Sequence, residues 1–388
     1  RMHISNNRDV INQFVKDLIT EINMLNDLFI SNKISPNVKE IHLGGGTPSH
    51  LTTKEIGEIV NSLKNFVKID GLDEFSMEID PRTVNRNHFP EYANLGVDRI
   101  SFGVQDFDDT VQKKINRVQP FELVETLLKH EIRKNFKGVN FDLLYGLPAQ
   151  TLKTFERTIN LTKELRPERI TLIRYAHIPD VRKHIKMIKE EDLPPTDHLP
   201  LMFLNSTQSL IEGNYSWVGI DHFAKQTDQL AIAKKEGRVY RNFGGETPGY
   251  TKDIISIGPT STSGFGNNYF QSTYDLNEYR KYVRNGEFPI TRQYSLSQED
   301  IIRRECNFSL QCNQFLDFDL ISKKFDIKTE KYFKREIEEL KNLEQKSMVL
   351  FKGNQVYVTL LGRYLVRHIC KVFDTFFDDK KKYQIHGN

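Results

Sequence analysis

The feature that most constrains the fold is an alternation of short apolar runs with amphipathic stretches between residues 38 and 179. Five runs have the composition of β-strands, at 38–43, 74–79, 98–104, 138–145 and 169–175. Strands separated by helical stretches are typical of parallel α/β proteins, because parallel neighbours need a long crossover. We therefore predict an α/β fold with a parallel sheet, which either closes into a barrel or stays open.

Between these strands, apolar residues recur at helical spacing and predict helices at 52–67, 121–136 and 151–166. The first has Thr52 and Thr53 as candidate N-caps. Later patterns predict a helix at 201–212, a strand at 215–224, helices at 301–310, 330–345 and 360–377, and a hairpin around Gly353 and Asn354. The Gly-rich segment 243–268 suits a lid or a close approach of backbone to a ligand.

Charge and composition disfavour several classes of protein. The chain has 55 Lys and Arg against 52 Asp and Glu, a net charge of +3, and no basic arm or acidic tail, so its charge favours neither nucleic acid nor a membrane surface as a partner. The C-terminal helices and hairpin also fit a DNA-binding winged helix, but acidic residues interleave with the lysines of 330–346 and would repel phosphate. No apolar stretch approaches the roughly 18 residues of a spanning helix.

The cysteines and histidines offer little support for a metal site. Cys306, Cys312 and Cys370 form no C-x-x-C pair, so we interpret them as core thiols of a protein in a reducing, cytoplasmic environment. His177 and His222 lie near strand ends and could ligate a metal, but no H-x-x-x-H or neighbouring cysteine accompanies them. We interpret both as hydrogen-bonded histidines.

Polar and glycine residues follow the predicted strands, where parallel α/β proteins place their ligands. Gly44, Gly45 and Gly46 come directly after the first strand and allow a ligand to approach the backbone. Neither a Walker sequence nor G-x-G-x-x-G spacing is present, which disfavours a cradle for nucleotide phosphates.

Two carboxylates are candidate ligand groups. Alternation places Glu78 on one face of its strand with Ser76 and Asp80, opposite Phe75, Met77 and Ile79. A carboxylate inside a barrel needs a cationic or hydroxylic partner, which could be a ligand ammonium, a ribose or a structural arginine. Asp142 poses the same question, with Arg117 as a candidate partner for it or for a ligand carboxylate, and Gln105 adds a neutral donor and acceptor.

Nine segments, in order, carry a resemblance that covers nearly the whole chain. They are GGGTPS, SMEIDPRTV, RISFGVQDFDDTVQKKINR, GVNFDLLYGLPAQT, RYAHIP, GIDHFA, YRNF, IIRREC and GRYLVRHICKVFD. The sequence resembles the oxygen-independent coproporphyrinogen III oxidase (coproporphyrinogen dehydrogenase) family, radical S-adenosylmethionine (SAM) enzymes of haem biosynthesis. The resemblance implies a partial (β/α) barrel with a mainly α-helical C-terminal domain. It places the barrel and its extension at 1–290, incomplete at the N-terminus, and the helical domain with its hairpin at 291–388.

The resemblance also implies the activity and its cofactors. The expected reaction is the anaerobic, SAM-dependent oxidative decarboxylation of coproporphyrinogen III to protoporphyrinogen IX, with a 4Fe-4S cluster, two SAM molecules and an electron donor. We expect a cytoplasmic monomer without nucleic acid. The residues implied for the first SAM are Gly45 and Glu78, and those implied for the second are Gly46, Thr47, Gln105, Arg117, Asp142 and Ala176. Thr262 stands at a SAM contact where the family has a small apolar residue or isoleucine. No catalytic residue is assigned.

Two departures from the family pattern stand out. The cluster motif C-x3-C-x2-C lies just ahead of the segment that residues 1–22 resemble and does not occur in this chain, although three thiolates are needed. Since the chain starts at Arg1, we expect the ligands upstream and this chain alone to be inactive, the alternative being a degenerate relative. The chain also reads GGETP at 244–248, near the substrate, where the family typically has Gln-Gly-Tyr-Thr-Thr. This loop keeps open a haem-methylating or ring-opening radical SAM enzyme, or a haem-trafficking protein.

Overall fold

The computed structural model describes residues 5–179, 187–249 and 252–376, and it divides into two compact units. The first unit runs to Gly213 and includes Ile255–Ser263 and Phe270–Gln293. The second comprises Asn214–Ile254, Gly264–Tyr269 and the chain from Tyr294 onward. Each unit is considered by itself, and the domain boundary expected after residue 290 stays a prediction.

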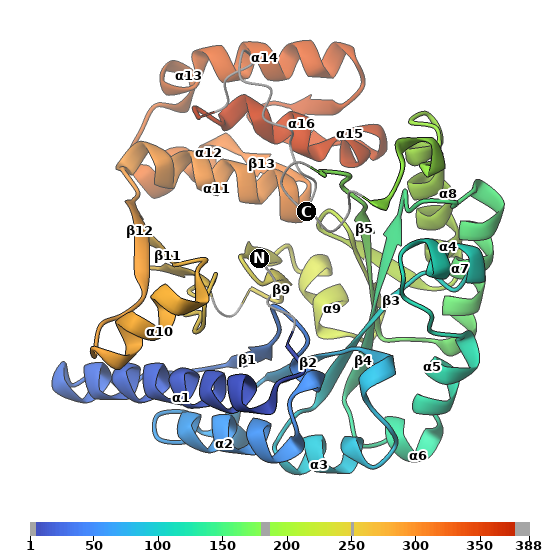
Figure 1. Cartoon of the computed structure of the whole chain (residues 1–388). Coiled ribbons are helices and arrows are strands. Elements are labelled where there is room, and N and C mark those ends of the chain that lie inside the picture. The colour runs from blue at the N-terminus through green and yellow to red at the C-terminus, as the bar shows by residue number, and fades with distance from the viewer. Residues whose placement is uncertain (1–4, 180–186, 250–251, 377–388) are drawn as a thin grey trace. The chain divides into compact units, whose positions relative to one another are not determined.

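A parallel sheet forms the centre of the first unit, as predicted (Figure 1). Its strands lie in chain order: β1 (Glu40–Leu43), β2 (Glu74–Ile79), β3 (Arg99–Gln105), β4 (Gly138–Tyr145) and β5 (Arg169–Arg174). The helices of this unit are α1 (Arg8–Ser31), α2 (Thr53–Leu63), α3 (His88–Asn94), α4 (Asp109–Lys114), α5 (Phe121–Leu127), α6 (His130–Arg133), α7 (Leu152–Leu165), α8 (His198–Glu212) and α10 (Leu276–Arg284). Thr52 caps α2 in a capping box with Glu55.

The helix predicted at 121–136 is two short helices, which corrects the sequence interpretation. The helix α5 closes at Leu128, whose N–H bonds the carbonyls of both Val124 and Glu125, and a separate turn begins at His130. Ile132 and Phe136 are nevertheless buried, as the periodicity indicated.

The outer face of the sheet is apolar and fully covered. The alternation predicted for β2 is present, since Phe75, Met77 and Ile79 are buried while Ser76 and Glu78 on the other face are partly exposed. The same face of the neighbouring strands buries Ile100, Phe102, Val104, Val139, Phe141, Leu143, Ile170 and Leu172. Burial of this face against helices supplies the main driving force for folding of the unit.

The inner face of the sheet is polar. At the amino-terminal ends of the strands, Glu74 accepts a hydrogen bond from Arg99 at 2.8 Å and pairs with Arg169 at 3.0 Å. Glu40 lies opposite Glu74 in the register, and burial together with the charge of Glu74 raises the pKa of Glu40 to about 7. A charged inner face is retained only where such groups find partners.

Buried carboxylates tie α1 to the later part of the first unit. Glu21 accepts hydrogen bonds from the Tyr279 hydroxyl at 2.6 Å and from the backbone N–H of Gly258 at 2.9 Å. Asp17 pairs with Arg280 and Arg284, each at 3.2 Å. These contacts fix α1 against α10 and the Gly258 turn.

The second unit begins with a hairpin where the sequence predicted one strand. Strands β6 (Tyr215–Val218) and β7 (His222–Lys225) are antiparallel. Gly219 turns the chain with a φ of 55°, and a Cβ there would lie 2.4 Å from a carboxylate oxygen of Glu246. The single predicted strand is therefore wrong, because its apolar pattern continues across a turn that depends on glycine. The helix α9 (Gln229–Lys235) and the hairpin of β8 (Tyr240–Asn242) and β9 (Gly245–Thr247) follow.

A three-stranded sheet of β10 (Thr262–Phe265), β11 (Asn268–Ser272) and β12 (Ile290–Ser295) has residues in both units. The rest of the second unit contains α11 (Gln298–Asn313), β13 (Phe315–Asp317), α12 (Phe318–Phe325), α13 (Thr329–Tyr332), α14 (Lys334–Gln345), β14 (Val349–Lys352), β15 (Gln355–Val358), α15 (Leu360–Tyr364) and α16 (Val366–Cys370). The hairpin at Gly353 is confirmed. The helix predicted at 360–377 is broken at Leu365, and its last residue lies outside the described residues.

The two buried cysteines agree with their interpretation as core thiols. Cys306 and Cys312 are free and buried in apolar clusters, and Cys370 is free and partly buried. Burial raises the pKa of Cys306 and of Cys370 to about 12. Across the described residues, no helix combines the length and apolarity that a membrane span requires.

Removing a ring from the outer face of the sheet should destabilise the protein. Phe141 is fully buried, with its ring centroid 6.2 Å from that of Phe102, so Phe141→Ala leaves a cavity. We expect a loss of about 3–5 kcal/mol in the free energy of unfolding, measured in urea by circular dichroism. The control Ile30→Ala, at a side chain 67% exposed, should change it by less than about 0.5 kcal/mol. Equal losses for the two variants would contradict this packing.

Candidate active site at the carboxyl ends of the parallel strands

The glycine loop after β1 approaches β2 closely. A Cβ at Gly44 would lie 2.3 Å from Nε2 of His42 and 2.7 Å from Oε1 of Glu78, so any larger residue there would displace the ends of these two side chains. Gly45 adopts a φ of 76°, in the left-handed region that glycine tolerates. The chain then forms a short turn, Pro48–His50, after Thr47. The loop thus brings its backbone beside the Glu78 carboxylate.

Glu78 has a histidine partner that the sequence interpretation missed. His42 Nε2 lies 3.3 Å from Oε1 of Glu78, and its Nδ1 lies 2.9 Å from the Ser76 hydroxyl. Burial by itself lowers the pKa of His42, but the hydrogen bond and charge of Glu78 outweigh it and raise the pKa overall. The sequence did offer one signal for this partner. His42 lies two residues before Gly44, and residues two apart along a strand share a face.

Asp142 lies deeper on the same face, one strand beyond β3. Its carboxylate accepts hydrogen bonds from Ser101 at 2.9 Å and from the Asn140 amide at 3.0 Å. Burial raises the pKa of Asp142, with the charge of Glu78 adding to the rise. The suggested pairing of Asp142 with Arg117 is wrong, because hydroxyl and amide donors satisfy this carboxylate and Arg117 pairs elsewhere.

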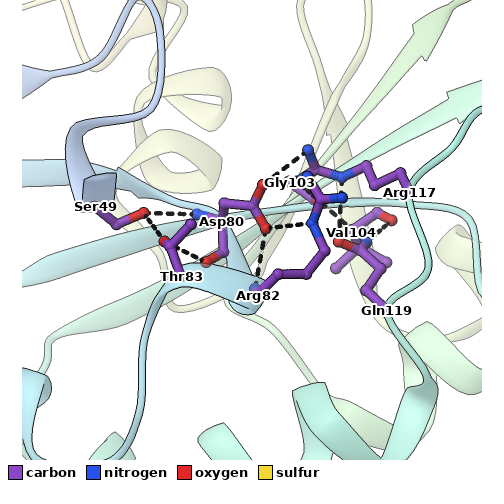
Figure 2. Close-up of polar contacts among 8 residues, drawn as sticks. All are labelled: Ser49, Asp80, Arg82, Thr83, Gly103, Val104, Arg117 and Gln119. Atoms are coloured by element: carbon purple, nitrogen blue, oxygen red, sulfur yellow. Dashed lines mark hydrogen bonds and ion pairs between the residues drawn. The ribbon is translucent and has the colours of Figure 1, made fainter. Parts of the chain in front are cut away.

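Arg117 is held by Asp80 and by the end of β3 (Figure 2). Its Nη1 lies 3.1 Å from Oδ2 of Asp80, and its Nη2 donates to the carbonyl of Gly103 at 2.9 Å. Gln119 accepts from the Nε of Arg117 at 3.1 Å, and Arg82 bridges both oxygens of Asp80. Burial alone raises the pKa of Asp80, but these arginines lower it overall. The guanidinium is thus held in place before any ligand arrives.

Gln105 ends β3 in a left-handed conformation with a φ of 66°. A Cβ at Gly103 would lie 2.9 Å from the Gln105 amide nitrogen and 3.1 Å from Nη2 of Arg117, so both side chains lie beside Gly103. The next residue, Asp106, is fully buried and accepts hydrogen bonds from Gln150 at 2.5 Å and Thr158 at 2.8 Å. Burial raises the pKa of Asp106 to about 6. This anchor offsets the strain at Gln105.

The predicted residues therefore form one group and two outliers. Close contacts and charge connect Gly44, Glu78 and Asp142. The side chains of Gln105 and Arg117 lie beside Gly103, a residue of β3, which is the strand between β2 and β4. Ala176 follows β5 and is partly exposed. Thr262, on β10, accepts a hydrogen bond from Gln271 at 3.3 Å and none from the residues above, within the described part of the chain. The group combines carboxylates, a guanidinium and free backbone, which suits a ligand carrying both an ammonium and a carboxylate.

The two histidines considered as metal ligands have protein partners, as interpreted. His177 lies 3.2 Å from the Tyr175 hydroxyl. In the second unit, Nδ1 of His222 lies 2.9 Å from Asp221 and 2.6 Å from Glu246. These three groups are near enough to share a metal ion, but Arg241 lies 2.6 Å from Glu246 and already provides a cation. The four side chains make a buried ion cluster of balanced charge.

Comparison with known proteins identifies the family. The radical SAM superfamily model matches residues 15–162. An oxygen-independent coproporphyrinogen III oxidase of Helicobacter pylori (strain J99) is 37% identical over 96% of this chain and 81% of its own length. The Escherichia coli (strain K12) enzyme of the same name is 34% identical over 90% of this chain and 76% of its own length. This chain belongs to the oxygen-independent coproporphyrinogen III oxidase family.

A solved structure supports the same assignment. Coproporphyrinogen III oxidase from Escherichia coli, described as a radical SAM enzyme, matches with a TM-score of 0.91 at 32% identity, over 97% of this chain and 86% of that one. The family and the fold class inferred from the sequence are thereby confirmed. The roles of the individual site residues stay predictions.

The ion cluster around His222 should make stability depend on pH. Burial lowers the pKa of His222, but Glu246 and Asp221 raise it overall to about 10. Because the unfolded value is about 6.5, the charge of His222 stabilises the fold fully below that pH, and its contribution falls as pH rises toward the folded pKa. The stability advantage of wild type over His222→Gln should therefore shrink between about pH 7 and 10, by up to about 1.4 kcal/mol per pH unit.

Urea unfolding followed by the fluorescence of Trp217 measures this difference, since the chain has one tryptophan and it lies in the same unit. A difference that stays constant over this range would show that His222 is not charged in the folded protein.

Proposed function

We propose that this protein carries out the anaerobic, SAM-dependent oxidative decarboxylation of coproporphyrinogen III to protoporphyrinogen IX in haem biosynthesis. Two propionate side chains would become vinyl groups. The observation that carries the proposal is the match to enzymes of this name over 96% of the chain, joined to a TM-score of 0.91 with one of them.

The inner face of the sheet, at the carboxyl ends of its strands, carries polar groups that suit SAM. Glu78 offers a carboxylate to an ammonium group beside the open backbone of Gly45, and we propose that these two bind the first SAM. Arg117 offers a guanidinium to a carboxylate, and Asp142 can accept from ribose hydroxyls. We propose that a second SAM binds Gly46, Thr47, Gln105, Arg117, Asp142 and Ala176, and that Thr262 is a further contact to SAM. When bound, SAM supplies the 5′-deoxyadenosyl group that abstracts hydrogen from the propionate side chains.

The protein side chains bind and orient in this scheme. The His42–Glu78 pair holds the carboxylate toward the glycine loop. Asp80 and the Gly103 carbonyl fix the direction of the Arg117 guanidinium, so little rotamer entropy is lost on binding. Ser101 and Asn140 donate hydrogen bonds that orient the Asp142 carboxylate and partly compensate its negative charge.

The cysteines of this chain do not fit a 4Fe-4S cluster. Cys306 and Cys312 are buried in apolar surroundings, and burial raises the pKa of Cys306 to about 12, whereas cluster ligands are exposed to the metal as thiolates. We propose that the three ligands lie upstream of Arg1, and that the protein is a cytoplasmic monomer served by a separate electron donor.

The altered loop at 244–248 gives no support to a different reaction. Glu246, which replaces the family's tyrosine, has a side chain with 0% exposure and pairs with Arg241 and His222. It also accepts a hydrogen bond from the backbone N–H of Ile220 at 3.2 Å. The residue that departs from the family pattern, Glu246, therefore contacts protein groups inside an ion cluster.

Product analysis tests the proposed function. The protein, extended upstream to include the cluster loop, is reconstituted with iron and sulfide under anaerobic conditions and given SAM, a reductant and coproporphyrinogen III. We expect mass spectrometry to find a product that has lost two carboxyl groups, together with 5′-deoxyadenosine. SAM cleavage with all four carboxyl groups retained would favour a haem-modifying enzyme, and stoichiometric haem binding without cleavage would favour a carrier. Either result contradicts the proposal.

A methyl group in the glycine loop should disrupt the first SAM site. In Gly44→Ala the new Cβ would collide with His42 and Glu78 and displace the carboxylate. We expect the KM for SAM of the reconstituted protein to rise at least about tenfold, because a well-placed charged hydrogen bond contributes about 1.5–3 kcal/mol. The matched control is Gly57→Ala in α2, where the Cβ would meet only Leu95 at 3.5 Å. An unchanged KM in Gly44→Ala would remove Glu78 from the site.

A further inference from the structure

One arginine of the second unit is placed like a ligand-binding group. The guanidinium of Arg363, on α15, lies over the ring of Trp217 at 3.9 Å from the centroid. It also donates from Nη2 to the Trp217 carbonyl. Its Nε is buried and has no hydrogen-bond partner. The stacking fixes the plane of the guanidinium while leaving hydrogen-bonding capacity unused.

A second cation lies near the first. Lys234, in the last turn of α9, is partly buried, and burial followed by the charge of Arg363 lowers its pKa to about 8. Burial also lowers the pKa of Arg363 to about 9. Among the described residues, neither Arg363 nor Lys234 forms an ion pair with a carboxylate.

Two other arginines of the same unit that are largely buried have carboxylate partners. Arg241 binds Glu246 at 2.6 Å, and Arg303 binds Glu336 at 2.8 Å. Two neighbouring, partly buried positive charges without an anion repel each other and have lost part of their hydration. An anionic ligand would offset both costs. A purely structural tether between α15 and β6 would not need a second cation beside it.

We propose that Arg363 and Lys234 bind a carboxylate of the tetrapyrrole substrate, at a propionate group that is not converted. This inference rests on the proposed function. Coproporphyrinogen III has four propionates and two are converted, so two carboxylates remain available to hold the substrate throughout the reaction. A guanidinium N–H together with an ammonium group is a suitable pair of donors for one carboxylate. Both side chains keep partial exposure, as a ligand site requires.

Equilibrium binding of coproporphyrin III, the stable oxidised form of the substrate, tests the proposal on the chain as it stands. Trp217, the only tryptophan, lies directly under Arg363 and reports binding through its fluorescence. We expect Arg363→Gln and Lys234→Gln each to weaken binding about tenfold, the effect of losing roughly 1.4 kcal/mol. Arg363→Lys, which keeps the charge, should retain more affinity than Arg363→Gln.

Two controls separate this site from general charge effects. Arg335→Gln, at a side chain 86% exposed, and Lys235→Gln, the exposed neighbour of Lys234, should bind as wild type does. The tetramethyl ester of coproporphyrin III should bind wild type no better than Arg363→Gln binds the free acid. Millimolar propionate should compete weakly if the site accepts any carboxylate, whereas the intact porphyrin should bind far more tightly.

The outcomes distinguish this proposal from the proposed function. Wild-type affinity in both Arg363→Gln and Lys234→Gln, or equal binding of ester and acid by wild type, would overturn the carboxylate site and leave the enzymatic reaction untouched. Failure of wild type to bind coproporphyrin III at all would contradict both. Circular dichroism checks the folding of each variant. The ester comparison needs no variant, so it decides the question even if Arg363→Gln does not fold.

Discussion

The inner face of the five parallel strands carries charged side chains from one end to the other, and each of them needs a partner. At the amino-terminal end Glu74 is held between Arg99 and Arg169. At the carboxyl end Glu78 pairs with His42, and Asp142 is bound by hydroxyl and amide donors. Such a face cannot be packed as an apolar core, because burial without compensation would cost too much. The apolar face beneath the helices stabilises the sheet, and the polar face remains available for a ligand.

Pairing explains why the site is rigid before a ligand binds. Asp80 and the Gly103 carbonyl determine the direction of Arg117 (Figure 2). The buried Asp106 holds the strained turn at Gln105. Groups fixed in this way act as a preformed environment for a charged ligand. In the second unit, the charged side chains of the ion cluster at His222 are likewise held in place by pairing with one another. Arg363 and Lys234 differ, because no carboxylate of the described residues pairs with either of them, and this is what points to substrate.

Local pattern was enough to predict the strands and the orientation of Glu78, because alternation depends only on neighbouring residues. It was not enough to predict partners. The pairing of Arg117 with Asp80 instead of Asp142 depends on how the loop after α4 folds back. The contact of His42 with Glu78 depends on the register of β1 against β2. The apolar pattern around Gly219 predicts one strand instead of a hairpin, because that pattern continues across the turn. The family emerged from motifs spread along the chain, whereas the role of each site residue depends on geometry and on ligand binding.

The most direct test of the central claim is a crystal structure of the reconstituted, upstream-extended protein with SAM. The account predicts that the SAM ammonium lies within hydrogen-bond distance of Glu78 beside the Gly44–Gly46 backbone, with Arg117 and Asp142 on a second SAM molecule. SAM bound away from the inner face, with Glu78 still paired only to His42, would contradict it.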